Sequence, residues 1–448
     1  MKTYTLPSRP LPLDDSWDVI VVGGGPSGCT AAASAAREGA KTLLVESTSS
    51  LGGMGTNALV PAWTPFSDKD TIIYRGMAEC VFNECKAGMP HVDPAALDWV
   101  PIDPERLKRI YDDLVTGHGA SILFNTQLSA VEMDGSDRVN ALILTNKKGL
   151  CAYRAKVYVD CTGDADLCAW AGAAFHKGNE TGERLMPATH CFILTNVDDL
   201  AYLKGPNLHA SNPESPIYKI VQSGKYPLIP DTHICSNHIG PRTVGFNAGH
   251  IWHVDNTEPA TVSKALVLGR KMAQSFRDAL AEFYPTAFAG SFLVATGSLL
   301  GIRETRRVIG DYELTLTDYM ERRSFPDEIC RNSYFIDVHW AASEAANNPE
   351  QFHKWDKSCI NYNKGESHGI PYRCLTPKGL ANVLVAGRSI SCEQIVQGSV
   401  RVMPVCLAMG EAAGMGAAFA ARMPQSDVHK ADTELMRRRL REEGAYLP

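Results

Sequence analysis

The chain has 448 residues, of which 44% are hydrophobic, and this length favours two joined domains of a globular enzyme. The formal net charge of −6 provides no attraction to nucleic acid or to an anionic membrane, so we expect neither as a partner. The sequence shows no apolar run of the roughly 20 residues that span a membrane, and residues 1–15 lack the apolar core of a secretory signal, which favours a cytoplasmic protein.

The first predicted elements form a βαβ unit. Asp18–Val22 (DVIVV) is apolar and rich in β-branched residues, as in a buried parallel strand. Cys29–Glu38 is rich in alanine and predicts a helix, with Gly39 at the position of a C-cap glycine. Lys41–Glu46 (KTLLVE) predicts the second strand.

An amphipathic helix is predicted next, at Asp103–Thr116, where Pro104 suits the first helical turn. Four strands should follow it, two of them joined as a hairpin around Gly135–Asp137. These strands are Ser121–Phe124, Leu128–Met133, Val139–Thr145 and Tyr153–Asp160.

The remaining elements are fewer and more scattered. Proline- and histidine-rich loops surround one long predicted helix at Thr261–Phe283, and Tyr334–Val338 (YFIDV) has the pattern of a strand. Asn382–Ala386 (NVLVA) predicts another buried strand, and Met403–Ala421 a helix of small residues. We therefore expect a discontinuous cofactor domain at 17–168 and 372–425, a substrate or cap domain at 169–371, and a helical tail at 426–448.

A glycine motif lies between the first strand and the first helix. Gly23, Gly25 and Gly28 have GxGxxG spacing, which provides a tight turn, room for a pyrophosphate and close helix–strand packing. The helix N-terminus would face the phosphates. Glu46 ends the second strand, where a carboxylate accepts hydrogen bonds from ribose hydroxyls and repels a 2′-phosphate. The spacing does not recur, which indicates one dinucleotide and no separate NAD(P)H domain.

Distal segments favour FAD over NAD in this site. Thr162-Gly163 and Gly387-Arg388 each form a turn at the end of a predicted strand, where the chain returns to the cofactor. The helix from Met403 would direct its positive N-terminus toward the flavin, which gains negative charge on reduction.

Together these motifs resemble a family of bacterial FAD-dependent oxidoreductases, distantly akin to the flavoproteins of fumarate reductase and heterodisulfide reductase. The resemblance runs from Trp17 to about Arg422. It implies an α/β fold, with a Rossmann-like FAD-binding domain of the glutathione-reductase type and a β-rich α+β substrate domain. Its further marks are Leu51–Thr56 (LGGMGT), Asp160–Asp166 (DCTGDAD), Gly301–Arg307 (GIRETRR), Ile370–Arg373 (IPYR), Val385–Arg388 (VAGR), Ser399–Pro404 (SVRVMP) and Gly410–Gly414 (GEAAG).

The resemblance also implies roles for single residues toward FAD. It places Asp164 and Gly387 near the ribityl and diphosphate groups, and the backbone of Leu128 at the adenine. Relatives that attach FAD covalently use a histidine after their Gly-Gly segment, and here Met54 stands there, so we expect non-covalent FAD. The expected cofactor contacts are Gly23, Gly25, Pro26, Ser27, Gly28, Glu46, Ser47, Gly52, Gly53, Met54, Thr56, Leu128, Thr162, Gly163, Asp164, Gly387, Arg388, Val400 and Arg401.

Two histidines are the first candidates for catalysis. His250 and His253 follow Gly245–Asn247, a stretch that in the family lines the substrate pocket, and the family commonly has other residues at these two places. An imidazole suits the removal of a hydroxyl proton because its pKa lies near neutrality. The alternative is a pair of ordinary hydrogen-bonded histidines. No cysteine or carboxylate spacing accompanies them, so we expect no metal.

Four further residues are candidates. Arg303, in the charged run GIRETRR, could bind a substrate carboxylate or the flavin, or belong to a structural ion-pair network. His339 precedes Trp340, a ring that could stack on a sugar or simply be buried. Tyr372 and Arg373 precede the last cofactor strand, which would place a proton donor or an anchor near the flavin.

The expected reaction is hydride transfer from a small polar substrate to flavin N5, with electrons passed on to O2, a quinone or a protein. A sugar or glycoside hydroxyl is the specific expectation. The alternatives are a flavin-dependent C=C reductase of an unsaturated acid, a non-catalytic or RNA-modifying flavoprotein, and a monooxygenase. The sequence leaves a homo-oligomer open.

Overall fold

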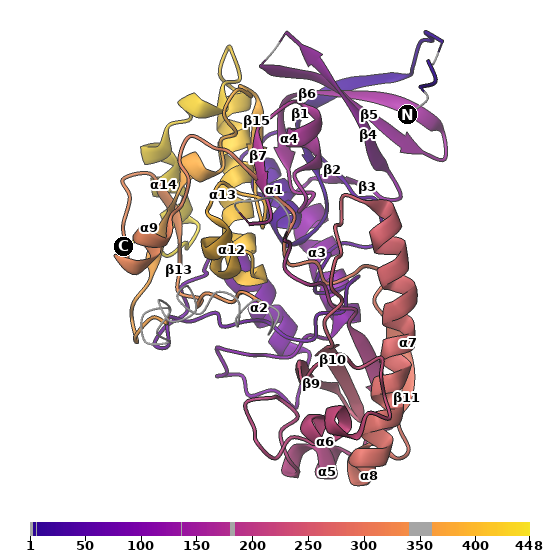
Figure 1. Cartoon of the computed structure of the whole chain (residues 1–448). Coiled ribbons are helices and arrows are strands. Elements are labelled where there is room, and N and C mark those ends of the chain that lie inside the picture. Colours follow the sequence, from indigo (N-terminus) through magenta and orange to yellow (C-terminus); the bar gives the residue numbers. More distant parts are fainter. Residues whose placement is uncertain (1–2, 6, 136, 180–183, 340–360) are drawn as a thin grey trace.

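The computed structural model describes residues 3–5, 7–135, 137–179, 184–339 and 361–448 (Figure 1). Its main sheet has seven strands in the order β3-β2-β1-β6-β5-β4, with β15 also paired to β6. Five of these strands are parallel and form the expected α/β core. They are β1 (Leu13–Val22), β2 (Thr42–Val45), β3 (Ser121–Leu123), β6 (Gly149–Asp160) and β15 (Val383–Val385).

Both faces of the parallel strands are buried. Val19 and Val21 pack against helices α1 (Pro26–Arg37) and α3 (Pro104–Gly117), whereas Ile20 and Val22 belong to a second hydrophobic cluster on the opposite face. This explains why the strand reads as a continuous apolar run. The second face is covered by the predicted hairpin of β4 (Gln127–Asp134) and β5 (Arg138–Asn146), and by α4 (Asp166–Trp170). Ser136 of its turn lies outside the described residues.

Helix α13 (Met403–Ala421) lies directly against α1, so that the yellow C-terminal region in Figure 1 joins the first βαβ unit. A Cβ atom at Gly414 would lie 2.1 Å from the carbonyl oxygen of Ala31, and one at Gly410 2.1 Å from that of Ser27. The small residues of α13 therefore permit backbone-to-backbone packing. The helix is long and apolar enough to span a membrane by composition, but 94% of its most apolar window is buried inside the protein.

A separate hydrophobic core forms the lower lobe in Figure 1, which we call the cap. Its antiparallel sheet has the order β11-β8-β10-β9, and the stacked rings of Phe192 and Phe246 lie at its centre. The strands are β8 (Phe192–Thr195), β9 (Ile234–Gly240), β10 (Thr243–Ala248) and β11 (Phe292–Thr296). The helices are α5 (Asp199–Lys204), α6 (Pro216–Ser223), α7 (Pro259–Phe283) and α8 (Pro285–Phe288).

The hydrophobic cores divide the chain differently from the expected boundary at residue 371. The cap core draws its buried residues from 188–302, whereas residues between 308 and 370 pack into the cofactor domain. The expected strand at Tyr334–Val338 is not a strand, because it has no neighbouring strand to pair with among the described residues. The elements of this region are β12 (Arg306–Val308), paired with β7 (Phe175–Lys177), α9 (Leu316–Met320), β13 (Glu328–Asn332) and β14 (His368–Pro371).

The C-terminal tail also joins this body, because α14 (Thr433–Glu442) buries Met436 and Leu440 in its core. The remaining elements are α2 (Met77–Ala87), α12 (Gln394–Val400), and two 3-10 turns at Tyr372–Cys374 and Val428–Lys430.

Candidate active site

One large cavity of about 920 Å³ runs from the glycine motif to the cap. This volume lies at the upper end of the range for small-molecule and cofactor sites. Its walls come from the carboxyl ends of the parallel strands, from the N-terminus of α13 and from cap segments. The fold therefore places the predicted cofactor site and the predicted substrate domain around one shared space.

The three motif glycines are required for different reasons. A Cβ at Gly28 would lie 1.7 Å from the carbonyl oxygen of Gly23, and one at Gly23, which has φ +97°, would lie 2.4 Å from that of Cys161. These two glycines serve the packing of the turn. At Gly25, a Cβ would meet no protein atom within 4 Å, and this residue lines the cavity. The space at Gly25 is thus left for a ligand, as a pyrophosphate requires.

Two further features of the cavity suit a dinucleotide. Gly25 is the N-cap residue of helix α1, and no side chain caps this helix end. The first amide groups of the helix therefore remain available to phosphate oxygens. Glu46 lines the cavity and accepts hydrogen bonds from the backbone N–H groups of Gly24 and Thr48, each at 2.7 Å. These contacts fix the carboxylate at the end of β2, where it can accept from ribose hydroxyls.

The distal segments reach the same cavity. Asp164 accepts from Arg388 Nη2 at 2.8 Å, Thr305 Oγ1 at 2.7 Å and Asn256 Nδ2 at 2.6 Å, which ties three distant segments together at the wall. Gly387, at φ +95°, approaches Ser27 so closely that a Cβ would lie 2.7 Å from its Oγ. The two predicted turns do return to the glycine motif.

Most of the expected cofactor residues line the cavity, and four do not. Gly28, Gly52, Thr56 and Val400 lie behind its wall. Thr56 Oγ1 donates to the carbonyl of Leu51 at 2.6 Å, and Gly52 has φ +100° beneath it, so this pair shapes the loop that presents Gly53 and Met54. Those in the wall are Gly23, Gly25, Pro26, Ser27, Glu46, Ser47, Gly53, Met54, Leu128, Thr162, Gly163, Asp164, Gly387, Arg388 and Arg401.

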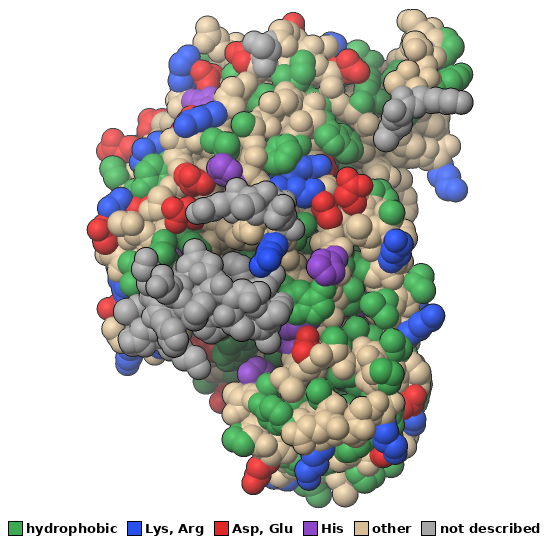
Figure 2. All heavy atoms as spheres, in the orientation of Figure 1, with side chains coloured by type: hydrophobic (Ala, Val, Ile, Leu, Met, Phe, Trp, Pro, Cys, Tyr) green, Lys and Arg blue, Asp and Glu red, His purple; other side chains and the backbone are tan. Residues whose placement is uncertain are grey.

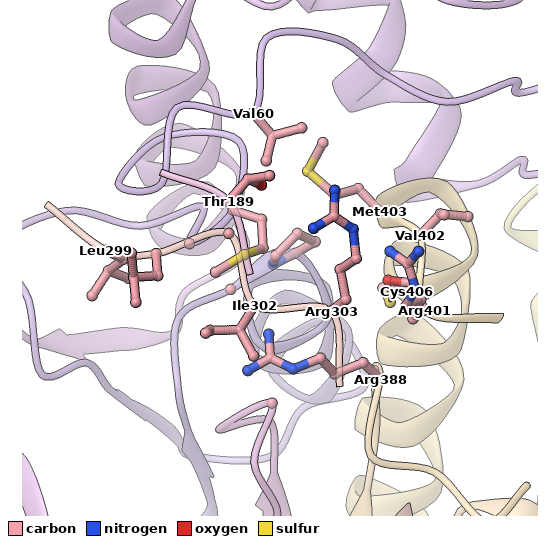
Figure 3. Close-up of a pocket in the computed structure, with 18 of the residues that line it drawn as sticks. Val60, Thr189, Leu299, Ile302, Arg303, Arg388, Arg401, Val402, Met403 and Cys406 are labelled. Carbon is pink, nitrogen blue, oxygen red and sulfur yellow. Dashed lines mark hydrogen bonds between the residues drawn. The ribbon is translucent and has the colours of Figure 1, made fainter. Parts of the chain in front are cut away.

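At the cap end, Figure 3 shows Arg303, Arg388 and Arg401 from separate segments around one part of the cavity, beside the start of α13. Arg388 and Arg401 are paired with Asp164 and Asp337, respectively. Arg303 is only 6% exposed and donates one hydrogen bond, from Nη1 to the carbonyl oxygen of Pro187 at 2.7 Å. No carboxylate lies within ion-pair distance of it among the residues that the structure describes.

Burial and the neighbouring Arg401 lower the pKa of Arg303 to about 10, which still leaves it cationic at neutral pH. The rest of the charged run is structural. Arg307 forms a buried ion pair with Glu304 at 2.7 Å, and Arg306 pairs with Asp166 at 2.7 Å. The structural interpretation thus holds for Arg306 and Arg307, whereas Arg303 lines the cavity without an ion-pair partner among the described residues.

Three histidines meet beside Arg303. The ligand-forming nitrogens of His233, His250 and His339 all lie within 4.8 Å of one another, and His233 and His339 line the cavity. His250 Nε2 is 2.9 Å from His339 Nδ1. The outer nitrogens contact carboxylates, His250 Nδ1 at 2.8 Å from Asp231 and His339 Nε2 at 3.2 Å from Asp337.

The surroundings of this cluster disfavour the charged forms of His233 and His339. Burial, and then the charge of Arg303, lower the pKa of His233 well below its ordinary value and that of His339 to about 4. Burial would raise the pKa of Asp337, but the contacts with His339 and Arg401 outweigh it and hold that pKa below its ordinary value. Two imidazoles with lowered pKa values, His233 and His339, thus lie in the cavity wall.

Three candidate catalytic residues lie elsewhere. His253 is exposed at φ +60° and does not reach the cavity wall. Tyr372 is buried and donates to the carbonyl of Val428 at 3.0 Å, and Arg373 pairs with Asp327 at 2.9 Å. The 3-10 turn at 372–374 carries both side chains away from the cavity, which corrects their expected place near the flavin. Trp340 lies outside the described residues.

The sequence interpretation missed His233, Asp231 and Asp337. A signal was present, since Asp231-Thr-His233 and Asp337-Val-His339 share an Asp-x-His spacing. Only the fold shows that these two segments meet, because the cap and connecting chain of residues 234–336 separate them.

Comparison with known proteins identifies the family. The sequence matches the FAD dependent oxidoreductase family over residues 18–440. Among solved structures, a geranylgeranyl bacteriochlorophyll reductase-like protein from Thermoplasma acidophilum has 13% identity and a TM-score of 0.50, covering 97% of this chain and 85% of its own. At such identity, the likeness concerns the fold alone.

Two further structures are more distant. The aromatic hydroxylase CabE of angucycline biosynthesis has 14% identity and a TM-score of 0.48 over 96% of this chain and 68% of its own. The anhydrotetracycline hydroxylase OxyS from Streptomyces rimosus has 12% identity and a TM-score of 0.46 over 96% and 74%. The family match covers nearly the whole chain and agrees with a cavity that fits a dinucleotide at its glycine end, so this protein belongs to the FAD dependent oxidoreductase family and uses FAD as its cofactor.

Proposed function

We propose that this flavoenzyme oxidises a small hydroxy acid, taking a hydride from the carbon that bears the hydroxyl group. The observation that carries the proposal is Arg303, a buried guanidinium in the cavity wall with one carbonyl contact and no carboxylate partner among the described residues. An isolated buried charge is costly unless an opposite charge compensates it. A substrate carboxylate would supply that charge through a bidentate pair.

The cap end of the cavity has the groups that such a substrate requires. A carboxylate at Arg303 would place a neighbouring hydroxyl near the imidazole of His233, which can accept its hydrogen bond. Bound FAD supplies the hydride acceptor at N5. Cap segments form part of the wall at this end.

A site that binds an anion changes the specific expectation for the substrate. The comparisons give no support for a sugar, and a neutral sugar would leave Arg303 without a counter-charge. A small hydroxy acid keeps the expected chemistry, which is oxidation of a carbon bearing a hydroxyl, and adds the charge that the site requires.

A C=C reductase of an unsaturated acid is the second candidate, because Arg303 and Arg401 both face the cavity. An arginine can bind the carboxylate of an unsaturated acid and a second one can deliver a proton. Arg401 already donates to the carbonyl oxygen and to the carboxylate of Asp337, at 2.9 and 3.1 Å, and this favours a structural role for it.

The two reactions are distinguished by anaerobic mixing. The purified yellow protein is mixed without oxygen with lactate, malate and mandelate, with the neutral compounds propanol and methyl glucoside, and with alanine. We expect flavin absorbance to bleach with at least one hydroxy acid and with none of the neutral compounds. Bleaching by methyl glucoside alone would overturn the proposal. If no compound bleaches the flavin and fumarate or crotonate reoxidises chemically reduced protein, the reductase is the correct function.

The remaining partners are inferred in the same way. We propose non-covalent FAD, since Met54 lies in the cavity wall at the place where relatives carry a linking histidine, and acid precipitation should release all flavin into solution. Charged side chains of both signs are interspersed on the face seen in Figure 2, which supports the expectation of no nucleic-acid partner. The order of the parallel strands supports a glutathione-reductase type of cofactor domain. O2, a quinone or a protein would accept the electrons.

A further inference from the structure

We propose that His233, His250 and His339 form a binding site for one divalent transition metal ion, of which Zn²⁺ is the reference, beside the flavin site. Their ligand-forming nitrogens lie within 4.8 Å of one another, and all three side chains are partly buried. Around a tetrahedral zinc ion with Zn–N bonds of about 2.1 Å, ligand nitrogens lie about 3.4 Å apart, a separation between the 2.9 Å of the His250–His339 pair and the 4.8 Å limit of the whole cluster.

The contact between His250 and His339 favours a cation. His250 Nδ1 donates to Asp231 and His339 Nε2 donates to Asp337, because carboxylates accept hydrogen bonds. The two inner nitrogens, 2.9 Å apart, are then both left with lone pairs. Two lone pairs at this distance repel each other unless a proton or a metal ion lies between them.

The third histidine is an independent observation. His233 stacks on His250 with ring centroids 4.2 Å apart, and its Nδ1 is buried without a hydrogen-bond partner among the described residues. A buried imidazole nitrogen in this state has a lone pair or a proton to satisfy, and a shared metal ion would satisfy the lone pair.

The surrounding shell matches that of metal-binding histidines. Such histidines almost always donate their second ring N–H to a carboxylate or carbonyl, which fixes the tautomer and the ring orientation. Asp231 and Asp337 do this for two of the three rings. The two carboxylates also place negative charge directly behind the rings, which favours a cation between them.

The fourth coordination position would open into the cavity, since His233 and His339 line it. Three histidines with one open position is the arrangement of catalytic rather than structural zinc. The open position would bind the hydroxyl oxygen of the substrate while Arg303 binds its carboxylate. The metal site stands without the proposed function, whereas this role toward the substrate rests on it.

The test is calorimetric titration of the flavin-loaded protein, treated with a chelator, by ZnCl₂, together with metal analysis after dialysis. We expect about one tightly bound zinc ion per chain, because the three imidazoles can bind it through their lone pairs. His250→Ala should weaken binding by about 100-fold or more, and Asp231→Asn by about 10–100-fold, as measured for carboxylates behind metal ligands.

His253→Asn is the matched control, because this exposed histidine lies three residues from His250 and asparagine tolerates its positive φ. It should bind zinc like the parent, and the flavin content of every variant should equal that of the parent. The proposal fails if the parent retains no zinc, or if His250→Ala binds it as tightly as the parent. Bleaching by a hydroxy acid in a protein that binds no zinc would remove the metal and leave the proposed function standing.

Discussion

Arg303 and Arg307 lie four positions apart in the sequence and differ in whether a carboxylate pairs with them. Both are buried, but Arg307 has Glu304 at 2.7 Å, and Arg303 faces the cavity without a carboxylate within the described chain. A different contrast separates His250, which contacts Asp231 and His339, from the exposed His253. At the scale of the residue, the surroundings that the fold gives each side chain, and not its type, distinguish the candidates for function.

Gly25 provides a direct test of the phosphate site. The residue has an ordinary extended conformation with φ −71° and ψ −175°, and a Cβ there would meet only the cavity. Gly25→Val should therefore fold normally and lose flavin, with FAD affinity falling at least about tenfold, the equivalent of about 1.4 kcal/mol of overlap. The ratio of flavin to protein absorbance measures this loss.

Gly28→Ala is the contrasting variant, since its Cβ would lie 1.7 Å from the carbonyl oxygen of Gly23. It should lose thermal stability as well as flavin. A Gly25→Val protein with a full complement of flavin would contradict the placement of the pyrophosphate.

Asp166 gives a pH-dependent prediction. Burial, and then the nearby Asp164, raise the pKa of Asp166 from 3.8 to about 6. Between these two values, the folded chain retains a proton that the unfolded chain releases, so this residue's contribution to stability falls as pH rises. The free energy of unfolding of the parent, measured relative to that of Asp166→Asn, should therefore fall from about pH 4 to about pH 7. Thermal unfolding of both proteins across this range measures it, and a constant difference would contradict the raised pKa.

At the scale of the element, the contact between α1 and α13 joins the two halves of a discontinuous domain. Thr30 Oγ1 donates to the carbonyl of Leu407 at 2.8 Å across this contact, and glycines face the partner backbone. The pairing carries α13 so that its N-terminus, with Val402 and Met403, reaches the cavity. The position of this helix end in the cavity wall thus depends on the packing of α13 against α1.

Gly414→Ala tests this contact. Alanine in a helix is normally more stable than glycine by up to about 1 kcal/mol. Here, the new Cβ would lie 2.1 Å from the carbonyl oxygen of Ala31, so we expect a net loss of about 1–3 kcal/mol and a lower melting temperature. Gly117→Ala in α3 is the control, because no atom lies within 4 Å of its added Cβ, and it should be neutral or stabilising. Equal effects of the two substitutions would refute close packing of α1 and α13.

At the scale of the whole molecule, the cavity is lined by both hydrophobic cores, so a ligand that fills it holds the cap and the cofactor domain together. Free FAD at about 100 times its Kd should stabilise the folded protein by about 2.7 kcal/mol. Calorimetry of the apoprotein with increasing FAD should show every unfolding transition moving upward. Gly25→Val should not respond, and a cap transition that stays fixed in the parent would contradict the shared site.

Much of the cofactor half could be predicted, because its signals are local. The DVIVV strand, the GxGxxG turn and the alanine-rich helix are adjacent in sequence, and each pattern has one physical meaning. The cap end could not, because it is assembled from distant loops. Tyr334–Val338 has the composition of a strand but no strand beside it in the described part of the chain, and its Asp337 pairs with Arg401 instead. Likewise, nothing local distinguishes Arg303 from its paired neighbours.

The central claim is that Arg303 binds the carboxylate of the substrate. The most direct measurement is a spectral titration of the bound flavin with mandelate and propanoate under anaerobic conditions. It compares the parent with Arg303→Lys and Arg303→Met. We expect saturable changes in the parent, with binding weakened about 100-fold or more in Arg303→Met, the equivalent of about 2.7 kcal/mol for a lost charge-assisted pair, and partly retained in Arg303→Lys. Equal affinity of the parent and Arg303→Met for both acids, at full flavin content, would contradict an anion-binding role of Arg303 and with it the proposed substrate class.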